Sequence, residues 1–361
     1  MRTRGTVRLA TRASDLALRQ SASVRDALAE RRFEVELVEM ETTGDQLRDE
    51  LIHRLGKTGA FVRTLDEAIL DGEVEGAVHS MKDVPTEGGD DLIVAAVPDR
   101  ARPNDVLVTP DGASLDDLPK GATVGTSSLR RRAQLLRRRP DLTVEPIRGN
   151  VDTRIEKLLA PTLQREHERR MEAEETDGDG EDDRTVDEWF DDLAEIERNA
   201  LGREVDAEYD AIVLAAAGLE RIGLIHHVPT TTLPVDEFVP APGQGALVVA
   251  MRDGDLAGAV NDAIDHPRTR VETTVERTIL RELGGGCVAP IGIHAVVQGE
   301  HVTVRVQVLD REGEEVIERS RDLPVENYYE TARAFATELA ESGADELIEE
   351  ARRREREEVD G

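Results

Sequence analysis

Six of the ten residues from Arg130 to Arg139 are arginines, in a protein whose formal net charge is -31. Arg130 and Arg131 fall in the first turn of a predicted helix, where the positive end of the helix dipole disfavours cations. Three hydroxyl side chains stand just before them, at the start of that helix: Thr126, Ser127 and Ser128. Hydroxyls, backbone N–H groups and guanidinium groups at one helix N-terminus indicate a binding site for an anion.

The other arginines of this helix lead to a different prediction. Arg137, Arg138 and Arg139 fall in its last turn, where the dipole stabilises cations by about 0.3–1 kcal/mol. They need no ligand there, so we interpret them as a solvated helix end that stops at Pro140. Arg132, between the two groups, fits either account.

More charged side chains follow predicted strands or open predicted helices elsewhere in the chain. They are Arg12 after TVRLAT, Lys82 and Asp83 after EGAVHS, Arg148 after LTVEPI, Arg154 one turn into the next helix, and Arg221 beyond IVLAAAG. Ligands of α/β sheets bind beyond the carboxyl ends of the strands. Any one of these residues alone fits a surface charge or an ion pair, but several at strand ends favour a pocket for a small polyanion.

A nucleic-acid surface is the competing explanation of the arginines. It would require a basic domain and aromatic side chains for stacking, whereas aromatic residues make up only 2% of this chain. The remaining surface is predicted to be acidic, since 77 Asp and Glu stand against 46 Lys and Arg. The composition therefore favours the polyanion pocket, and we expect no nucleic-acid partner.

The charge balance also indicates a solvent of high salt concentration. Repulsion among so many carboxylates strains the compact state in dilute buffer, and molar salt, with a Debye length of about 3 Å, screens it. Only four cationic residues are lysines. An acidic, lysine-poor surface indicates the cytoplasm of an extreme halophile, because an ordinary acidic protein would not explain the scarcity of lysine.

Compartment and redox chemistry follow from what the sequence lacks. No apolar run approaches membrane-spanning length and no apolar signal segment opens the chain, so we expect a cytoplasmic protein without a membrane partner. The single cysteine, Cys287, excludes a disulfide within the chain and a multi-cysteine metal site, and no metal is expected. A lone cysteine is usually a small buried hydrophobe, but this one follows three glycines in a predicted loop, where a bulky adduct could be accommodated.

The order of strand and helix patterns must position these residues. The first hundred residues alternate the two, with Ser14 a candidate cap of the first helix, and the pattern restarts near residue 104. This alternation predicts two similar α/β lobes in tandem with a cleft between them. After residue 268, a helix at 270–283, alternating strands and an amphipathic helix at 326–352 predict a small third α+β domain.

One stretch of the second lobe breaks the pattern. Residues 172–183 are mostly acidic and have no apolar side chain larger than alanine, which predicts disorder. The sequence VDEWFDDLAEIERNAL downstream predicts an amphipathic helix whose apolar residues, Trp189, Leu193 and Ile196, pack on the host lobe.

Eight stretches together resemble the porphobilinogen deaminase family, also called hydroxymethylbilane synthase. They are LATRASDLAL, KTGAFVRTLDEAIL, AVHSMKDVPTE, VGTSSLRRRAQL, IRGNVDTR, YDAIVLAAAGLERIGL, PAPGQGAL and LGGGCVAPIG. They occur in family order and span almost the whole chain, so the resemblance is highly specific. The departures are local: an insertion at about 161–205, and an arginine in KTGAFVR where the family often has lysine.

The resemblance implies a fold and its division into domains. We expect an α/β fold of two lobes like those of type II periplasmic binding proteins, plus a small C-terminal α+β domain. The first lobe is expected at residues 1–100 and 244–265, the second at 104–240, and a cofactor-anchoring domain at 268–361. A monomer is expected.

The resemblance also implies a reaction. Four porphobilinogen molecules, each with an acetate and a propionate, are joined head to tail into hydroxymethylbilane with loss of ammonia, in tetrapyrrole biosynthesis. The product grows on a dipyrromethane cofactor, bound through a thioether that the resemblance assigns to Cys287. Each pyrrole brings two carboxylates, so the cleft must accumulate negative charge, which explains the arginines.

The family motifs carry further roles over to this sequence. The expected cofactor-binding residues are Cys287, Arg130, Arg131, Ser128, Lys82 and Asp83. The expected substrate-binding residues are Arg12, Ser14, Thr126, Ser127, Arg148, Arg154, Arg221 and Gln244.

Asp83 and Lys82, which is next to it, are the expected catalytic residues. Loss of ammonia leaves an electron-poor azafulvene, whose positive charge a fixed carboxylate near the pyrrole N–H stabilises; the same carboxylate can assist proton transfer. Lys82 could hold a substrate carboxylate. Alone, a Lys-Asp pair in a loop would be interpreted as a surface pair, but its place in HSMKDVP favours the catalytic role.

The alternative is a two-lobed small-anion-binding protein without catalysis. Such a protein needs no reactive cysteine and usually carries an export signal, so the sequence favours the enzyme.

Overall fold

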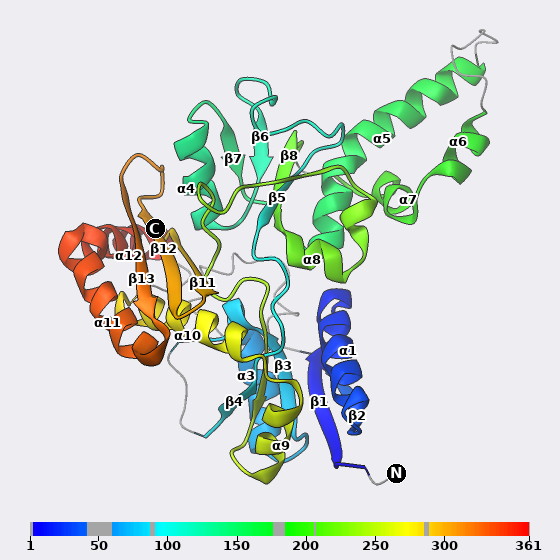
Figure 1. The fold of residues 1–361 in the computed structure, drawn as a ribbon. Helices are drawn as coiled ribbons and strands as arrows, with labels where there is room; N and C mark the ends of the chain where they lie inside the picture. Colours follow the sequence, from blue (N-terminus) through cyan, green and yellow to red (C-terminus); the bar gives the residue numbers. More distant parts are fainter. Residues whose placement is uncertain are drawn as a thin grey trace.

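The computed structural model of the chain describes residues 3–41, 60–86, 91–175, 185–205, 207–284 and 289–360. These residues form two α/β lobes and a smaller third domain, each built on its own sheet (Figure 1). The α/β class expected from the alternating patterns is confirmed. No helix within these ranges is long and apolar enough to cross a membrane.

The sheet of the first lobe has the strand order β2-β1-β3-β10-β4. Its strands are β1 (Thr6–Arg12), β2 (Glu34–Met40), β3 (Gly76–Ser80), β4 (Ile93–Ala96) and β10 (Leu247–Met251). β1 runs parallel to β2 and β3, whereas β10 runs antiparallel to β3 and β4. Apolar sides of α1 (Asp15–Glu30) and α9 (Asp255–Ile264) pack on one face of the sheet, and α3 (Ala60–Leu70) packs on the other.

The sheet of the second lobe has the order β7-β6-β8-β5-β9. Its strands are β5 (Asp105–Val108), β6 (Thr123–Gly125), β7 (Thr143–Glu145), β8 (Ala211–Ala215) and β9 (Thr230–Thr232), and its main helices are α4 (Leu129–Arg138), α5 (Val151–Glu175) and α8 (Ala216–Arg221). β5 is antiparallel to both of its neighbours. Because β10 returns to the first sheet, the chain crosses between the lobes twice, at residues 97–104 and 233–246 (Figure 1).

Between α5 and β8 the second lobe carries two short helices, α6 (Val186–Asp192) and α7 (Glu195–Leu201). The single helix expected here is wrong, because Leu193 between them has extended backbone. Trp189 is nevertheless buried against α5, with the Arg170 guanidinium carbon 5.4 Å from its ring centroid. The disorder expected for residues 172–183 is wrong for 172–175, which continue α5 with glutamates that favour a helix; residues 176–183 lie outside the described residues.

The third domain is an antiparallel sheet covered by helices. Its strands are β11 (Ile291–Gln298), β12 (His301–Leu309) and β13 (Val316–Pro324), and its helices are α10 (Pro267–Glu282), α11 (Tyr328–Leu339) and α12 (Asp345–Asp360). The helix expected at 270–283 is confirmed as α10. The single helix expected at 326–352 is wrong: it breaks at a wide turn, Ala340–Ala344, where Gly343 adopts left-handed backbone with φ of 100°.

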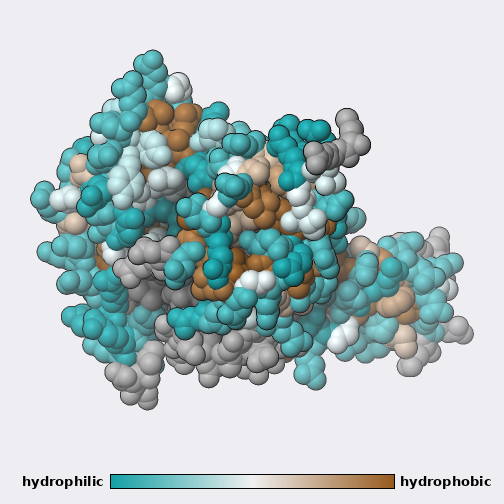
Figure 2. All heavy atoms as spheres, turned by 90° about the horizontal axis from the view of Figure 1, so that it is seen from below, coloured by the Kyte–Doolittle hydropathy of each residue, from teal (hydrophilic) through white to brown (hydrophobic). Residues whose placement is uncertain are grey.

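The surface is dominated by charged side chains. Hydrophilic residues cover most of the face seen in Figure 2, with hydrophobic residues gathered in smaller patches. Many arginines pair with exposed carboxylates, as Arg138 does with Asp116 at 2.8 Å and Arg321 with Glu338 at 2.6 Å. Such exposed pairs each contribute little stability, and less at high salt.

Candidate active site

The start of α4 fixes three hydroxyl groups in the turn that follows β6. Ser128 is the N-cap, and its Oγ accepts the backbone N–H of Arg131 at 3.4 Å. The Ser128 N–H donates to Thr126 Oγ1 at 3.2 Å, and the Ser127 hydroxyl donates to the Ile147 carbonyl at 2.5 Å. These bonds hold the turn before the two arginines in one conformation.

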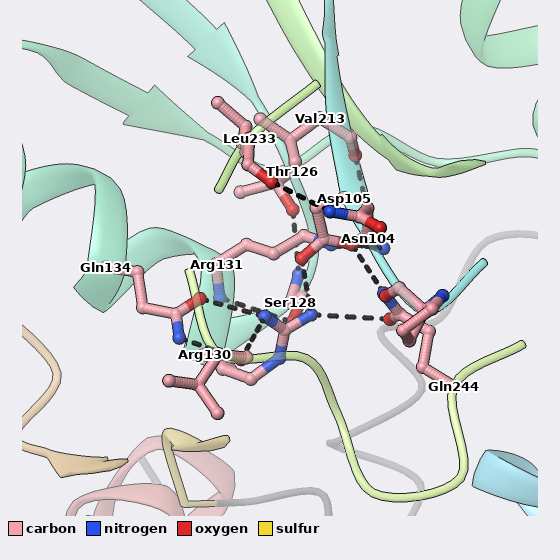
Figure 3. Close-up of polar contacts among 12 residues, drawn as sticks. Asn104, Asp105, Thr126, Ser128, Arg130, Arg131, Gln134, Val213, Leu233 and Gln244 are labelled. Carbon is pink, nitrogen blue, oxygen red and sulfur yellow. Dashed lines mark hydrogen bonds and ion pairs between the residues drawn. The ribbon is translucent and has the colours of Figure 1, made fainter. Parts of the chain in front are cut away.

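Arg130 and Arg131 bind a buried carboxylate, that of Asp105 at the start of β5 (Figure 3). Asp105 Oδ2 lies 2.8 Å from Arg130 Nη2, and Asp105 Oδ1 lies 2.8 Å from Nη2 and 3.1 Å from Nε of Arg131. The exposed fractions are 0% for Asp105, 5% for Arg130 and 7% for Arg131. Burial alone would raise the pKa of Asp105, but the charges of the two guanidinium groups lower it to about 2. These two arginines, for which the sequence predicts an anionic ligand, are therefore paired with a carboxylate of the chain itself.

Asp105 was missed by sequence reasoning. The signal was its place at the head of the strand DVLV, whose four residues are all buried. A charged side chain at the head of a buried strand requires a buried partner. The sequence does not say which of the many arginines supplies it.

Arg130 has almost no bonding capacity left for a ligand. Its Nη1 donates to Gln134 Oε1 at 2.8 Å and to the Val239 carbonyl at 2.9 Å, and its Nη2 donates to Asp105 and to Gln244 Oε1 at 3.4 Å. Of the five N–H donors of an arginine, only Nε–H lacks a partner in the described part of the chain, and that atom is buried. Arg130 therefore acts chiefly within the protein.

Arg131 keeps more donors available. It donates twice to Asp105 and once, from Nη1, to the Val213 carbonyl at 3.1 Å, which leaves a further N–H on each Nη atom among the described contacts. The half-buried Arg154 donates from Nε to the Gly149 carbonyl at 2.9 Å. Burial and the charge of Arg131 lower the pKa of Arg154 to about 10. No carboxylate among the described residues pairs with Arg154, so this pair of cations can accept an external anion.

The arginines of the last turn of α4 differ from one another. The helix ends at Arg138, before Pro140, as expected. Arg138 is exposed, in agreement with a solvated helix end. The expectation is wrong for Arg139, which is half-buried, pairs with Asp141 at 2.8 Å and donates to the Leu115 carbonyl at 2.7 Å. Arg139 therefore fixes a neighbouring loop.

The predicted residues at the N-terminal end of the first lobe lie where expected. Ser14 caps α1 and accepts the Ala17 N–H at 3.4 Å. Arg12 is half-buried at the end of β1. In the second lobe Arg148 is half-buried, and its side chain makes no hydrogen bond or ion pair with the described residues.

Lys82 and Asp83 end a short turn, η1 (Met81–Asp83), directly after β3. Met81 is buried, whereas both charged side chains are exposed. Neither side chain bonds to another group within the residues that the structure describes. An exposed carboxylate at a strand end is available to a ligand.

Residues 243–245 pass between this turn and the arginine cluster, which comprises Arg130, Arg131 and Arg154. Gly243 has left-handed backbone with φ of 74°, and a Cβ there would lie 2.6 Å from Met81 Cγ and 3.3 Å from the backbone nitrogen of Lys82. Only glycine therefore allows the segment to lie against the 81–83 turn.

The next two residues reach the arginines. Gln244 Nε2 donates to Asp105 Oδ1 at 2.9 Å (Figure 3), and the Gly245 carbonyl accepts Arg221 Nη2 at 2.6 Å. Burial lowers the pKa of Arg221 to about 10, although the charge of Glu220 opposes this. One short segment thus contacts both the predicted catalytic turn and the residues around the arginine cluster.

Cys287, the expected cofactor anchor, lies outside the described residues, between the end of α10 and Ala289. Among the residues that are described, no group of three or more His, Cys, Asp or Glu side chains could hold a metal ion.

Two protein-family models match the chain. The porphobilinogen deaminase dipyrromethane cofactor-binding domain matches residues 7–168 and 198–259, and the porphobilinogen deaminase C-terminal domain matches residues 271–342. A probable porphobilinogen deaminase of Halobacterium salinarum is 52% identical, over 96% of this chain and 98% of its own length. The chain belongs to the porphobilinogen deaminase family.

Further comparisons gave lower sequence identity. A probable porphobilinogen deaminase of Methanococcoides burtonii is 39% identical over 95% of this chain and 96% of its own. Among solved structures, lipoprotein Tp32 of Treponema pallidum has a TM-score of 0.35 and 13% identity, covering 77% of this chain and 95% of its own. The methionine-binding protein MetQ has a TM-score of 0.37 and 12% identity, covering 72% and 89%. The assignment to the family rests on the sequence matches.

Membership of the porphobilinogen deaminase family confirms the function expected from the sequence. The chain is a transferase of tetrapyrrole biosynthesis with a dipyrromethane cofactor, and a binding protein without catalysis is not favoured. The two α/β lobes and the separate C-terminal domain that were expected are confirmed as well. The halobacterial relative supports the halophilic character expected from the charge balance.

Proposed function

We propose that this porphobilinogen deaminase acts on its substrate through Asp83 and binds substrate carboxylates through the free donors of Arg131 and Arg154. Residues 243–245 carry the proposal, because they contact the turn of Asp83 on one side and Asp105 on the other. The reacting group and the carboxylate-binding groups then belong to one site between the lobes.

Asp83 acts when porphobilinogen loses ammonia. The bond between the aminomethyl carbon and nitrogen breaks, the nitrogen leaves as ammonia, and the pyrrole ring becomes an azafulvene with positive charge on its nitrogen. The exposed Asp83 carboxylate accepts the hydrogen bond of that N–H and stabilises the charge. The former aminomethyl carbon then bonds to a ring carbon of another pyrrole. The proton that leaves this ring carbon can pass to the same carboxylate.

Most of the remaining predicted residues hold carboxylates of the substrate and product. Arg12, Arg148 and Arg221 supply further guanidinium groups, and hydroxyl donors come from Ser14 and Thr126. The Ser127 hydroxyl and the Gln244 amide already donate within the chain, so these two residues fix the shape of the site. Forked guanidinium–carboxylate contacts keep their direct hydrogen bonds when salt screens longer-range attraction. Arg130 contributes mainly by fixing Asp105 and Gln134.

The dipyrromethane cofactor fits the donors that are present. Two carboxylates on each pyrrole match guanidinium and hydroxyl donors, which Arg131, Ser128 and Lys82 offer around one helix start and one strand end. The buried Arg130 Nε–H, without a partner among the described residues, is a further donor next to this set. When bound, the cofactor supplies the pyrrole carbon to which the first substrate is joined. Cys287 holds it through a thioether.

The proposal also includes the compartment, the oligomeric state and the partners of the protein. The protein is a cytoplasmic monomer, it binds porphobilinogen as its substrate, and it binds no nucleic acid. The lobe boundaries are those given by the sequence, 1–100 with 244–265 and then 104–240, followed by 268–361. The three separate sheets support this division.

The cofactor assignment is tested by the intact mass of the purified protein. We expect an increment equal to two deaminated porphobilinogen units, and no increment in Cys287→Ser, because a hydroxyl does not replace the thiolate as a nucleophile toward an azafulvene. Cys287→Ser should remain folded. A Cys287→Ser protein that still carries the increment would contradict the anchor.

The arginine assignment is tested by two variants of α4. Arg131→Leu should lower the rate of pyrrole addition by about 10²-fold, since it removes charge-assisted hydrogen bonds of about 1.5–3 kcal/mol. Arg138→Gln, on the exposed end of the same helix, should leave the rate almost unchanged. Melting curves in molar salt show whether each variant is folded. Equal losses of activity in the two folded variants would contradict the division of the helix.

A further inference from the structure

Arg277, in the middle of α10, binds the chain on both sides of Asp83. Its Nη1 donates to the carbonyls of Met81 at 3.2 Å and Val84 at 2.8 Å, and its Nη2 donates to the carbonyl of Pro85 at 2.7 Å. A side chain of the third domain therefore reaches the segment of the first lobe that carries the proposed catalytic carboxylate.

Few other hydrogen bonds hold this segment, although the buried Met81 and the partly buried Val84 belong to an apolar cluster. The η1 turn is three residues long, closed by the bond of the Val84 N–H to the Met81 carbonyl at 3.3 Å, and such a turn is weak by itself. The Met81 N–H donates to the Ala246 carbonyl at 3.0 Å, which anchors the start of the turn. After Asp83, the described hydrogen bonds from outside the segment all come from Arg277.

The geometry requires an arginine. Three carbonyl oxygens from separate residues are bound by one planar group with donors in a fixed fork, which the single ammonium of a lysine could not reproduce. Arg277 is half-buried, and none of its described bonds goes to a carboxylate. Burial and the charge of Arg281 lower its pKa, which shows that it is held here at some electrostatic cost.

Glu276, the residue before Arg277, fixes the position of α10. Glu276 is fully buried and pairs with Arg100 of the first crossing at 2.8 Å. It also accepts the Gly243 N–H of the second crossing at 2.7 Å and the Ala295 N–H of β11 at 2.8 Å. Arg277 therefore extends from a helix that is already fixed to both crossings of the chain.

We propose that Arg277 is a positioning residue for Asp83: its bonds to the three carbonyls set the position of the 81–85 segment, and thereby where the Asp83 carboxylate meets the substrate. The proposal rests on the proposed role of Asp83. A carboxylate that stabilises a developing charge must be held in a narrow range of positions, and a displacement of 1 Å can cost about 10²-fold in rate.

The first test compares Arg277→Gln with Arg281→Gln, one turn further along α10 and bound to Glu282 and Tyr329. Rates are measured per cofactor-loaded molecule, counted by intact mass. Arg277→Gln should lower kcat by about tenfold to a hundredfold with little change in KM, whereas Arg281→Gln should leave kcat unchanged. Arg277→Lys keeps the charge without the fork and should rescue only part of the loss. Equal kcat in the Arg277 and Arg281 variants would overturn the proposal.

The second test combines Arg277→Gln with Asp83→Asn. If Arg277 acts through the Asp83 carboxylate, the double variant should be little slower than Asp83→Asn alone, because the two effects are not independent. Multiplication of the two losses would assign Arg277 a separate, merely structural role. Near-normal turnover of Asp83→Asn would instead contradict the role of Asp83, so failure of the proposed function is distinguished from failure of this inference.

A third readout does not depend on activity. Hydrogen exchange of a peptide that includes residues 81–86 should be faster in Arg277→Gln than in the parent protein, and unchanged in Arg281→Gln, because local opening follows the loss of local contacts. Unchanged exchange in Arg277→Gln, with the melting temperature also unchanged, would show that its bonds do not hold the segment.

Discussion

Asp83→Asn should lower the turnover of porphobilinogen by at least about two orders of magnitude, the scale on which a catalytic electrostatic or acid–base group is lost. The amide keeps the shape of this exposed side chain and much of its hydrogen-bonding capacity, but it removes the charge that would stabilise the azafulvene. Formation of hydroxymethylbilane, measured per cofactor-loaded molecule, gives the size of the loss.

A matched control for this variant is Asp71→Asn. Asp71 is another exposed carboxylate of the first lobe, just after the end of α3 and outside the site. It should retain full turnover. A loaded Asp83→Asn enzyme with near-normal turnover would remove Asp83 from the reaction, and an equal loss in the control would attribute the effect to net charge.

Asp105→Asn should destabilise the fold by about 3–5 kcal/mol, the cost of removing one partner from a buried ion pair. Arg130 and Arg131 would remain buried without the carboxylate that neutralises part of their charge. The measurement is the free energy of unfolding from denaturant titration at a fixed molar salt concentration.

Asp116→Asn is the control for Asp105→Asn, because it removes an exposed carboxylate that also pairs with an arginine of α4. It should cost at most about 1 kcal/mol, and that cost should shrink as salt rises. The cost of Asp105→Asn should persist in molar salt, since buried pairs are screened much less. Similar costs for both variants would contradict the view that the Asp105 pair is energetically buried.

The stability that the Asp105 ion pair contributes should depend on pH. The pKa of Asp105 falls from 3.8 to about 2 on folding, so the folded state binds fewer protons than the unfolded state in that range. The contribution is fully present above about pH 4 and is lost as the pH falls toward 2. Asp105→Asn should lack this part of the acid sensitivity.

Much of the fold could be predicted because local signals agreed with the tertiary structure. Ser14 caps the first helix through the expected bond, and α4 begins after Ser128 and ends before Pro140, as hydroxyl caps and proline dictate. Strands such as β4, β8 and β10 are short apolar runs, and the order of strands and helices along the chain is the pattern of an α/β sheet.

The site was predicted less completely, because it depends on partners far apart in the sequence. The helix dipole correctly marked Arg130 and Arg131 as residues that need an anion, but no local signal paired them with Asp105. The break in the C-terminal helix has a similar cause: Gly343 costs only about 1 kcal/mol within a helical pattern, and the packing of α11 and α12 on one core decides that the helix bends there.

The order of strands in the first sheet has a consequence for synthesis on the ribosome. β10 lies between β3 and β4, with Val249 opposite both Val78 and Ala96, yet it is made more than a hundred residues after them. Until residue 251 has left the ribosome, β4 has no neighbour in its sheet and one side of β3 is unpaired. The second sheet, by contrast, is complete at residue 232. Although domains usually fold from the N-terminus during translation, here the lobe made second can mature first, and the lobe with Asp83 closes only after it.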